Sequence, residues 1–165
     1  MTILPDLLQP GLALVFCGTA PGTVSAQRKA YYANPGNAFW PTLHAVGLTP
    51  HRVASGNYAS VLQYGIGLTD LAKNTFGADS SLAKTDFDRV ALEEKIMRFQ
   101  PGLLAFTSKR AGLEFLGHPV GYGLQAETIG TTRLFVLPSP SGLARSHWTI
   151  EPWEELARLR QALQC

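Results

Sequence analysis

The sequence predicts a single α/β domain of three layers over residues 1–165, with a central sheet that is mostly parallel. Short, continuous apolar runs recur along the chain, and such runs are typical of strands that are buried on both faces. Segments with helical apolar spacing lie between them. The chain contains no internal repeat, no low-complexity tract and no linker long enough to divide it.

The strands are predicted from apolar runs that end next to Gly, Pro or Ser. These residues favour turns, so each run has a defined end. The expected strands are Leu12–Cys17, Leu103–Ser108 and Thr132–Pro138, with Gly65–Thr69 as a brief strand or an extended turn.

The helices are predicted from apolar spacing and from residues suited to their ends. Asn37 and Ser108 each precede a helical pattern, where a side-chain oxygen can accept a backbone N–H, and Gly47 is suited to end the first helix. The expected helices are 38–46, 86–100, 109–116 and a last one that begins near Pro152. The last helix is expected to carry one apolar stripe, made of Trp153, Leu156, Leu159 and Leu163.

Composition limits the possible functions. The chain is 45% hydrophobic and 16% charged, which is typical of a folded domain, and its net charge of +2 permits a polyanionic partner without requiring one. The two cysteines lie far apart and the four histidines lack metal-ligand spacing, so we expect neither a disulfide framework nor a metal site.

Other signals are missing from the sequence. No apolar run approaches the ~18 residues of a membrane span, and the N-terminus lacks a basic region followed by an apolar core, so we expect a cytoplasmic protein. The sequence contains no G-x-S-x-G elbow of an α/β hydrolase, and neither G-x-G-x-x-G nor a phosphate-binding GK[ST] motif.

Two loops that follow predicted strands are candidates for one site. Gly18–Gly22 follows the first strand, and Ser139–Arg145 follows the third. If these strands are parallel neighbours, both loops emerge at the edge where open α/β sheets bind ligands. The second loop offers hydroxyl groups and an arginine, which suit a phosphate, and Leu143, which suits a wedge between stacked bases. An ordinary tight turn with a surface arginine is the alternative.

Four motifs follow one another in a specific order: VFCGTAPG, YYANPGNAFW, GIGLTDLAK and LPSPSGLAR. In these motifs the chain resembles the mismatch-specific uracil-DNA glycosylases, the Mug and thymine-DNA glycosylase branch of the uracil-DNA glycosylase superfamily, from about Gly11 to the last helix. The resemblance implies a monomeric DNA repair hydrolase with a uracil-DNA-glycosylase-like fold. Such an enzyme flips uracil, preferably mispaired, out of double-stranded DNA and hydrolyses its N-glycosidic bond without a metal or cofactor, leaving an abasic site.

The resemblance also implies a pocket for the flipped base. Tyr32 matches the aromatic residue on which the base stacks, and backbone N–H groups around Gly18–Ala20 are expected to stabilise charge on the departing base. Asn37 has two possible roles, as a helix cap and in base recognition. The predicted base pocket consists of Gly18, Thr19, Ala20, Pro21, Gly22, Ser25, Tyr32 and Asn37.

The loop after the third strand is expected to bind the DNA. Leu143 would fill the gap left by the flipped nucleotide, and Arg145 would contact the opposite strand or a phosphate. The predicted DNA-binding residues are Ser139, Ser141, Gly142, Leu143 and Arg145. Further possible phosphate contacts, each equally explained as an ordinary surface charge, are Arg28, Lys29, Lys73, Lys109 and Arg110.

One departure from the family pattern concerns the catalytic group. The family's first motif usually reads G-I-N-P-G, and its asparagine positions the attacking water, but this chain has Ala20 there. Either the chain binds mismatched or damaged DNA without cutting it, or another side chain has taken the role. Asp70 is the best candidate, because a carboxylate can accept a proton from water. The alternative is that Asp70 caps a helix that starts at Leu71.

Overall fold

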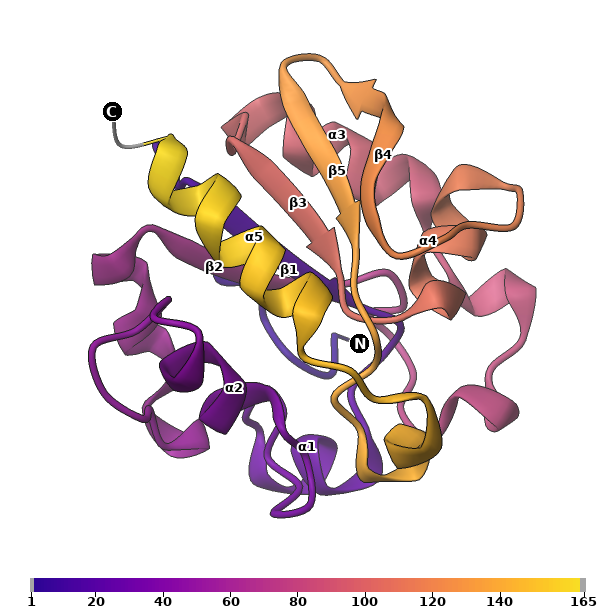
Figure 1. Ribbon diagram of the computed structural model, residues 1–165. Helices are drawn as coiled ribbons and strands as arrows, with labels where there is room; N and C mark the ends of the chain where they lie inside the picture. Colours follow the sequence, from indigo (N-terminus) through magenta and orange to yellow (C-terminus); the bar gives the residue numbers. More distant parts are fainter. Residues whose placement is uncertain (1, 164–165) are drawn as a thin grey trace.

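The computed structural model describes residues 2–163 and shows an α/β fold built on a five-stranded sheet (Figure 1). The strand order is β2-β1-β3-β5-β4, and all neighbouring pairs are parallel except the antiparallel pair β4 and β5. This confirms the predicted fold class. The strands are β1 (Leu14–Gly18), β2 (Ile66–Asp70), β3 (Leu103–Phe106), β4 (Gly123–Ile129) and β5 (Thr132–Val136).

Helices cover both faces of the sheet, and Figure 1 shows α5 crossing in front of the strands while α3 lies behind them. The α-helices are α1 (Thr23–Arg28), α2 (Phe39–Ala45), α3 (Arg89–Phe99), α4 (Lys109–Leu116) and α5 (Glu151–Ala162). Short 3₁₀ segments are η1 (Ser55–Tyr64), η2 (Asp79–Ser81), η3 (Lys84–Asp86) and η4 (Gly142–His147). None of the helices within residues 2–163 is long and apolar enough to cross a membrane.

The alternation of side chains along β1 divides the core into two clusters. Leu14 and Phe16 face α2, η1 and α5, whereas Val15 and Cys17 face α3 and α4. All residues of β1, β2 and β3 are buried, as expected of parallel strands with both faces covered. In the edge strand β4 only the end residues Gly123 and Ile129 are buried, and the residues between them alternate between exposed and half-buried, so its sequence lacks the continuous apolar run that predicted the others.

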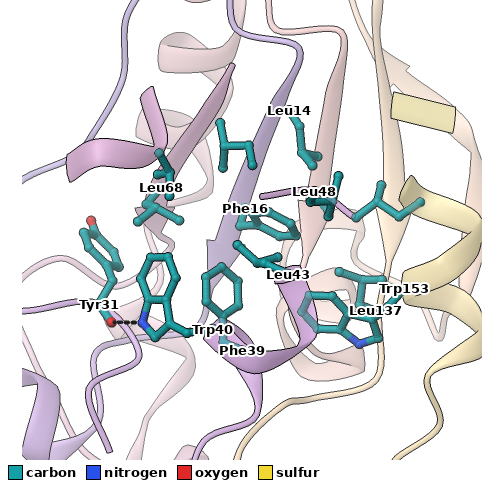
Figure 2. Packing of buried hydrophobic residues seen from close by; sticks show 14 of the residues in the cluster. Leu14, Phe16, Tyr31, Phe39, Trp40, Leu43, Leu48, Leu68, Leu137 and Trp153 are labelled. Atoms are coloured by element: carbon teal, nitrogen blue, oxygen red, sulfur yellow. Dashed lines mark hydrogen bonds between the residues drawn. The ribbon is translucent and has the colours of Figure 1, made fainter. Parts of the chain in front are cut away.

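Aromatic packing holds the segment before α2 against the sheet. Phe39 contacts Phe16 edge-on, with ring centroids 5.0 Å apart. The Trp40 indole N–H donates to the carbonyl oxygen of Tyr31 at 3.0 Å (Figure 2). Because Tyr31 is itself buried, these contacts fix the backbone on the N-terminal side of α2, where Tyr32 lies.

The predicted helix ends are partly confirmed. The Ser108 hydroxyl accepts a hydrogen bond from Ala111 N at 3.1 Å, which confirms the cap of α4. The helix expected from residue 86 begins only at Arg89, because Asp88 caps it. The predicted place of Leu163 in the stripe of α5 is wrong: the helix ends at Ala162, and Leu163 is 45% exposed.

Candidate active site

The parallel strands end side by side at one edge of the sheet. Gly18, the last residue of β1, pairs in register with Asp70, the last residue of β2. The segments that follow remain joined, because Leu71 N donates to Gly18 O at 2.9 Å and Ala72 N donates to Thr19 O at 2.7 Å. β3 lies between β1 and β5, so those two strands are not direct neighbours. Figure 1 nevertheless shows α1 and the gold loop after β5 at the same end of the sheet.

A cavity of about 690 Å³ opens at this edge. All residues of the predicted base pocket, the predicted catalytic Asp70 and the five predicted DNA-binding residues line it. The structure therefore brings the loops Gly18–Gly22 and Ser139–Arg145 together with the end of β2. The predicted residues that line the cavity are Gly18, Thr19, Ala20, Pro21, Gly22, Ser25, Tyr32, Asn37, Asp70, Ser139, Ser141, Gly142, Leu143 and Arg145. Their roles stay predictions.

Asp70 lies in the wall of this cavity at the end of β2. Its side chain is only 4% exposed, and its Oδ2 atom has no hydrogen-bond partner among the described residues. No helix follows it, because residues 71–78 form an irregular segment. The alternative that Asp70 caps a helix starting at Leu71 is therefore wrong. Since an unpaired buried carboxylate oxygen is costly, it is the kind of group retained at functional sites.

Burial changes the acid–base chemistry of Asp70. Removal from water raises the pKa of its carboxyl group to about 7, an effect partly opposed by Lys73 and Lys95 and reinforced by Asp6. A group with this pKa exchanges its proton near neutral pH, which suits a general base. Above that pH it is a carboxylate whose buried Oδ2 atom accepts no hydrogen bond from residues 2–163.

Gly18 makes room for this carboxylate. A Cβ atom at Gly18 would lie 2.7 Å from Asp70 Oδ1, closer than real Cβ contacts allow. The same point lies 3.4 Å from the Tyr32 hydroxyl and 3.5 Å from Thr107 Oγ1. Three oxygen atoms from separate segments therefore converge over the end of β1, and any side chain at Gly18 would displace the carboxylate.

Tyr32 lies in the cavity wall in an unusual backbone conformation, with a positive φ of 51°. One face of its ring stacks on Phe39, with centroids 3.8 Å apart and planes inclined by 15°. Its hydroxyl lies 3.2 Å from Thr107 Oγ1. The stack and this polar contact fix the Tyr32 ring in the cavity wall.

The loop after β1 forms another part of the wall. Thr19 Oγ1 donates to Asp79 Oδ1 at 2.7 Å, and Gly77 N donates to Pro21 O at 2.9 Å. These bonds hold the segment 77–79 beside the loop, and both line the cavity. Between them, Ala20 contributes only a methyl group, which can neither orient nor activate water.

Polar side chains before α2 support the loops themselves. Asn37 Oδ1 accepts a hydrogen bond from Phe39 N at 2.8 Å, but the N-cap residue of α2 is Ala38, so Asn37 lies one residue before the cap position that the sequence predicted for it. Ser25 Oγ accepts from Ala33 N at 3.1 Å. The amide N–H groups of Asn37 are not used in this bond, so a role in base recognition stays a prediction.

The loop after β5 is held by its own side chains. Ser139 Oγ accepts from Ser141 N, and Ser141 Oγ accepts from Leu143 N, each at 3.2 Å. Ala38 N donates to Pro140 O at 2.8 Å, which ties this loop to the start of α2. Leu143 is 85% exposed at the tip. An apolar side chain held out into water on an ordered loop suits insertion into another surface.

Some residues of the site were not predicted from the sequence, and others have partners that differ from those expected. Thr107 lines the cavity directly after β3, whereas the predicted strand Leu103–Ser108 had included it, because β3 ends two residues earlier at Phe106. Lys73 is engaged in an ion pair with Asp6, with Nζ 2.8 Å from Oδ1, and its side chain is only 13% exposed. Arg110 donates to the carbonyl oxygens of Asp79 and Leu82. These partners replace the phosphate contacts expected of Lys73 and Arg110.

Within residues 2–163, no three His, Cys, Asp or Glu side chains lie close enough together to hold a metal ion. The polar groups of the cavity are hydroxyls, side-chain amides, backbone groups, the guanidinium of Arg145 and the carboxylates of Asp70 and Asp79. The chemistry that these groups can supply is proton transfer to the buried carboxylate and hydrogen bonding to a polar ligand.

The fold and the site define a three-layer α/β domain whose binding cavity lies at the carboxyl ends of its parallel strands and contains a buried carboxylate. The chain belongs to the uracil DNA glycosylase superfamily, whose sequence profile matches residues 5–162. It is also similar in fold to the solution structure of a protein from Methanosarcina acetivorans that is named provisionally as a uracil DNA glycosylase. The TM-score is 0.63, the sequence identity is 23%, and the match covers 96% of each chain. Superfamily membership assigns to the chain the role of a DNA glycosylase, a hydrolase that acts on DNA in repair.

Proposed function

We propose that this protein flips uracil, preferably mispaired, out of double-stranded DNA and hydrolyses its N-glycosidic bond, with Asp70 as the general base. The observation that carries the proposal is the buried Asp70 carboxylate, whose Oδ2 atom has no hydrogen-bond partner in the described part of the chain, in the cavity wall that also contains Tyr32. We also propose that the chain belongs to the Mug and thymine-DNA glycosylase branch and acts as a monomer in the cytoplasm.

Access to the glycosidic bond requires the nucleotide to leave the stack. This step costs a few kcal/mol in a duplex and less at a mismatch, because the mismatched base is already less well paired. The exposed Leu143 would occupy the gap, and Arg145 at the same loop would contact a phosphate or the opposite strand. A preference for mispaired uracil follows from the lower cost of extrusion.

The flipped base would stack on the face of the Tyr32 ring opposite Phe39. Stacking of a base on an aromatic ring contributes ~1–3 kcal/mol, and Phe39 behind the ring keeps this platform fixed. Stacking alone does not select uracil. Polar contacts from the loop Gly18–Gly22, from Thr107 and from the amide of Asn37 would supply hydrogen bonds to the edge of the base.

Asp70 would act in the hydrolysis step. Its carboxylate accepts a proton from a water molecule, the water oxygen forms a bond to the anomeric carbon, and the bond from that carbon to the base nitrogen breaks. The electron pair leaves with the base, whose negative charge is stabilised by backbone N–H groups around Gly18–Ala20 before it takes up a proton. The negative charge of the carboxylate also stabilises the positive charge that develops on the sugar.

The test is release of free base from matched oligonucleotides that carry G:U, A:U or single-stranded uracil. The proposal predicts alkali-labile abasic sites, with the fastest release from G:U. The competing function is a reader of mismatched or damaged DNA that does not cut it, and the departure at Ala20 is the observation that favours it. Tight binding of G:U DNA without release of uracil, from protein with an intact fold, would establish the reader and refute the glycosylase.

A further inference from the structure

A chain of alternating charges includes Lys73 and is bonded to Thr69, two residues that lie close to Asp70 in the sequence at the end of β2. Asp6 is at its centre: its Oδ1 accepts from Lys73 Nζ at 2.8 Å and from Thr69 Oγ1 at 2.6 Å, and its Oδ2 accepts from Lys95 Nζ at 2.7 Å. The side chains of Asp6, Lys73 and Lys95 are between 13% and 25% exposed. Such a network is screened less by water and salt than a surface ion pair.

Lys73 connects this network with the cavity. Its Nζ atom donates to the Tyr31 hydroxyl at 3.2 Å, and that hydroxyl donates to the carbonyl oxygen of Pro5 at 2.9 Å. Tyr31 lines the same cavity as Asp70. The N-terminal segment is fixed against β2, because Leu7 and Leu68 exchange backbone hydrogen bonds of 2.9 and 3.0 Å. The ammonium group is therefore held in one place.

The lack of a direct partner makes Asp70 sensitive to these charges. Because its Oδ2 accepts no hydrogen bond in residues 2–163, the protein stabilises its negative charge through neighbouring cations, and the surrounding medium is of low dielectric. Lys73 and Lys95 favour the carboxylate form, whereas Asp6 opposes it. Asp6 itself stays ionised: burial raises its pKa, but its hydrogen bonds to Lys73, Lys95 and Thr69 outweigh burial and lower it.

Asp79 and Arg145 line the same cavity as Asp70, and three further titratable side chains near Asp70 are uncharged at neutral pH. Burial raises the pKa of Cys17 on β1, and it likewise raises the pKa of Tyr31 and of Tyr32. The charges that act on the pKa of Asp70 come from Lys73 after β2, from Asp6 in the N-terminal segment and from Lys95 on α3.

We propose that Lys73, held by Asp6 and Tyr31, is a positioning residue that sets the pH at which Asp70 becomes a base. The inference rests on the proposed role of Asp70 in catalysis. It gives the N-terminal segment a part in activity, although that segment supplies only Leu4 to the cavity wall. It also predicts that Lys73→Met and Asp6→Asn shift the pH midpoint of Asp70 in opposite directions, which a purely structural role of the network would not.

The test uses two readouts on the full chain. One is the titration of the Asp70 carboxyl carbon by NMR in the free protein, with the resonance identified through Asp70→Asn. The other is the pH dependence of uracil release from G:U DNA, normalised to the plateau at high pH. Lys73→Met is expected to raise both midpoints by about one pH unit, so that the rate well below the midpoint falls about tenfold relative to the plateau.

Asp6→Asn is expected to lower both midpoints, because it removes the opposing carboxylate while the asparagine can still accept hydrogen bonds from Thr69 and Lys73. Lys73→Arg should keep the midpoints near wild type, since it preserves the charge. Lys84→Met, at an exposed site outside the network, is the matched control and should leave them unchanged.

Midpoints that stay fixed in both Lys73→Met and Asp6→Asn would overturn the inference. Midpoints that fall in both would also overturn it, because that result indicates water entering a loosened site. If the carboxyl titration shifts as expected but wild type releases no base, the inference about ionisation stands and the proposed function fails. If wild type releases base and the titration of Asp70 does not respond, the proposed function stands and this inference fails.

Discussion

The buried carboxylate of Asp70 should make the protein less stable than it would be with a neutral side chain at this position. The pKa of Asp70 rises from its usual 3.8 to about 7 in the folded protein. At 1.36 kcal/mol for each pKa unit, keeping the group ionised in the fold costs about 4 kcal/mol. Asp70→Asn removes this cost with almost no change of shape, and it removes no hydrogen bond at Oδ2, which has none.

The sign of the effect depends on pH. The folded protein retains the proton up to about pH 7, whereas the unfolded chain loses it near pH 3.8, so between these values the wild-type free energy of unfolding falls as pH rises. Below both pKa values Asp70→Asn should change the free energy of unfolding little. Above about pH 7 it should raise the free energy of unfolding by about 4 kcal/mol.

Urea denaturation of wild type and Asp70→Asn between about pH 4.5 and pH 8.5 measures this difference. The advantage of the variant should grow by about 3 kcal/mol over the range. Asp88→Asn is the matched control, because Asp88 is an exposed cap of α3 and asparagine caps helices equally well. A difference that does not change with pH, or a variant less stable than wild type at high pH, would refute the argument that Asp70 is ionised against a desolvation cost.

Three further substitutions test the geometry of the site. Gly18→Ala should cut uracil release at least tenfold and destabilise the fold by about 1–3 kcal/mol, because its Cβ would lie 2.7 Å from Asp70 Oδ1. Gly56→Ala is the control, because its Cβ would meet no atom of the described residues within 4 Å. Equal rates of uracil release for the two variants would contradict the predicted clash. Leu143→Ala should keep the free energy of unfolding within about 0.5 kcal/mol of wild type, because Leu143 is exposed. It should slow uracil release from duplex DNA more than from single-stranded DNA. Equal slowing on both substrates would exclude the role of Leu143 as a wedge. Ala20→Asn should raise uracil release in a single-turnover assay, and no change in a folded variant would mean that this loop does not place water.

The sequence predicted the elements whose residues carry a local signal. β1 and β3 are continuous apolar runs, and α4 has Ser108 at its start, so both kinds of element could be located without coordinates. β4 was missed because only its end residues Gly123 and Ile129 are buried, so its sequence carries no continuous apolar run, and its pairing with β5 is not visible in either segment alone.

In the site, too, residues with a local sequence signal were predicted, whereas roles that depend on tertiary contacts were not. The motifs identified residues that line the cavity, because three of the four contain or follow the carboxyl end of a strand, whereas YYANPGNAFW joins α1 to α2. The roles of Lys73 and Asp6 depend on the N-terminal segment, which packs along β2 some sixty residues away in sequence. The cap assigned to Asp70 as an alternative also failed for a tertiary reason: the backbone after it pairs with the loop after β1 instead of forming a helix.

The most direct test of the account is single-turnover release of uracil from G:U DNA by wild type, Asp70→Asn and Asp70→Ala, with DNA affinity measured on the same preparations. We predict that wild type leaves abasic sites, that both variants bind the DNA, and that both release uracil at least a hundredfold more slowly, which is at the low end of the ~10²–10⁴ that a general base contributes. Variants that cut as fast as wild type would contradict the central claim, because the buried carboxylate would then have no part in the reaction.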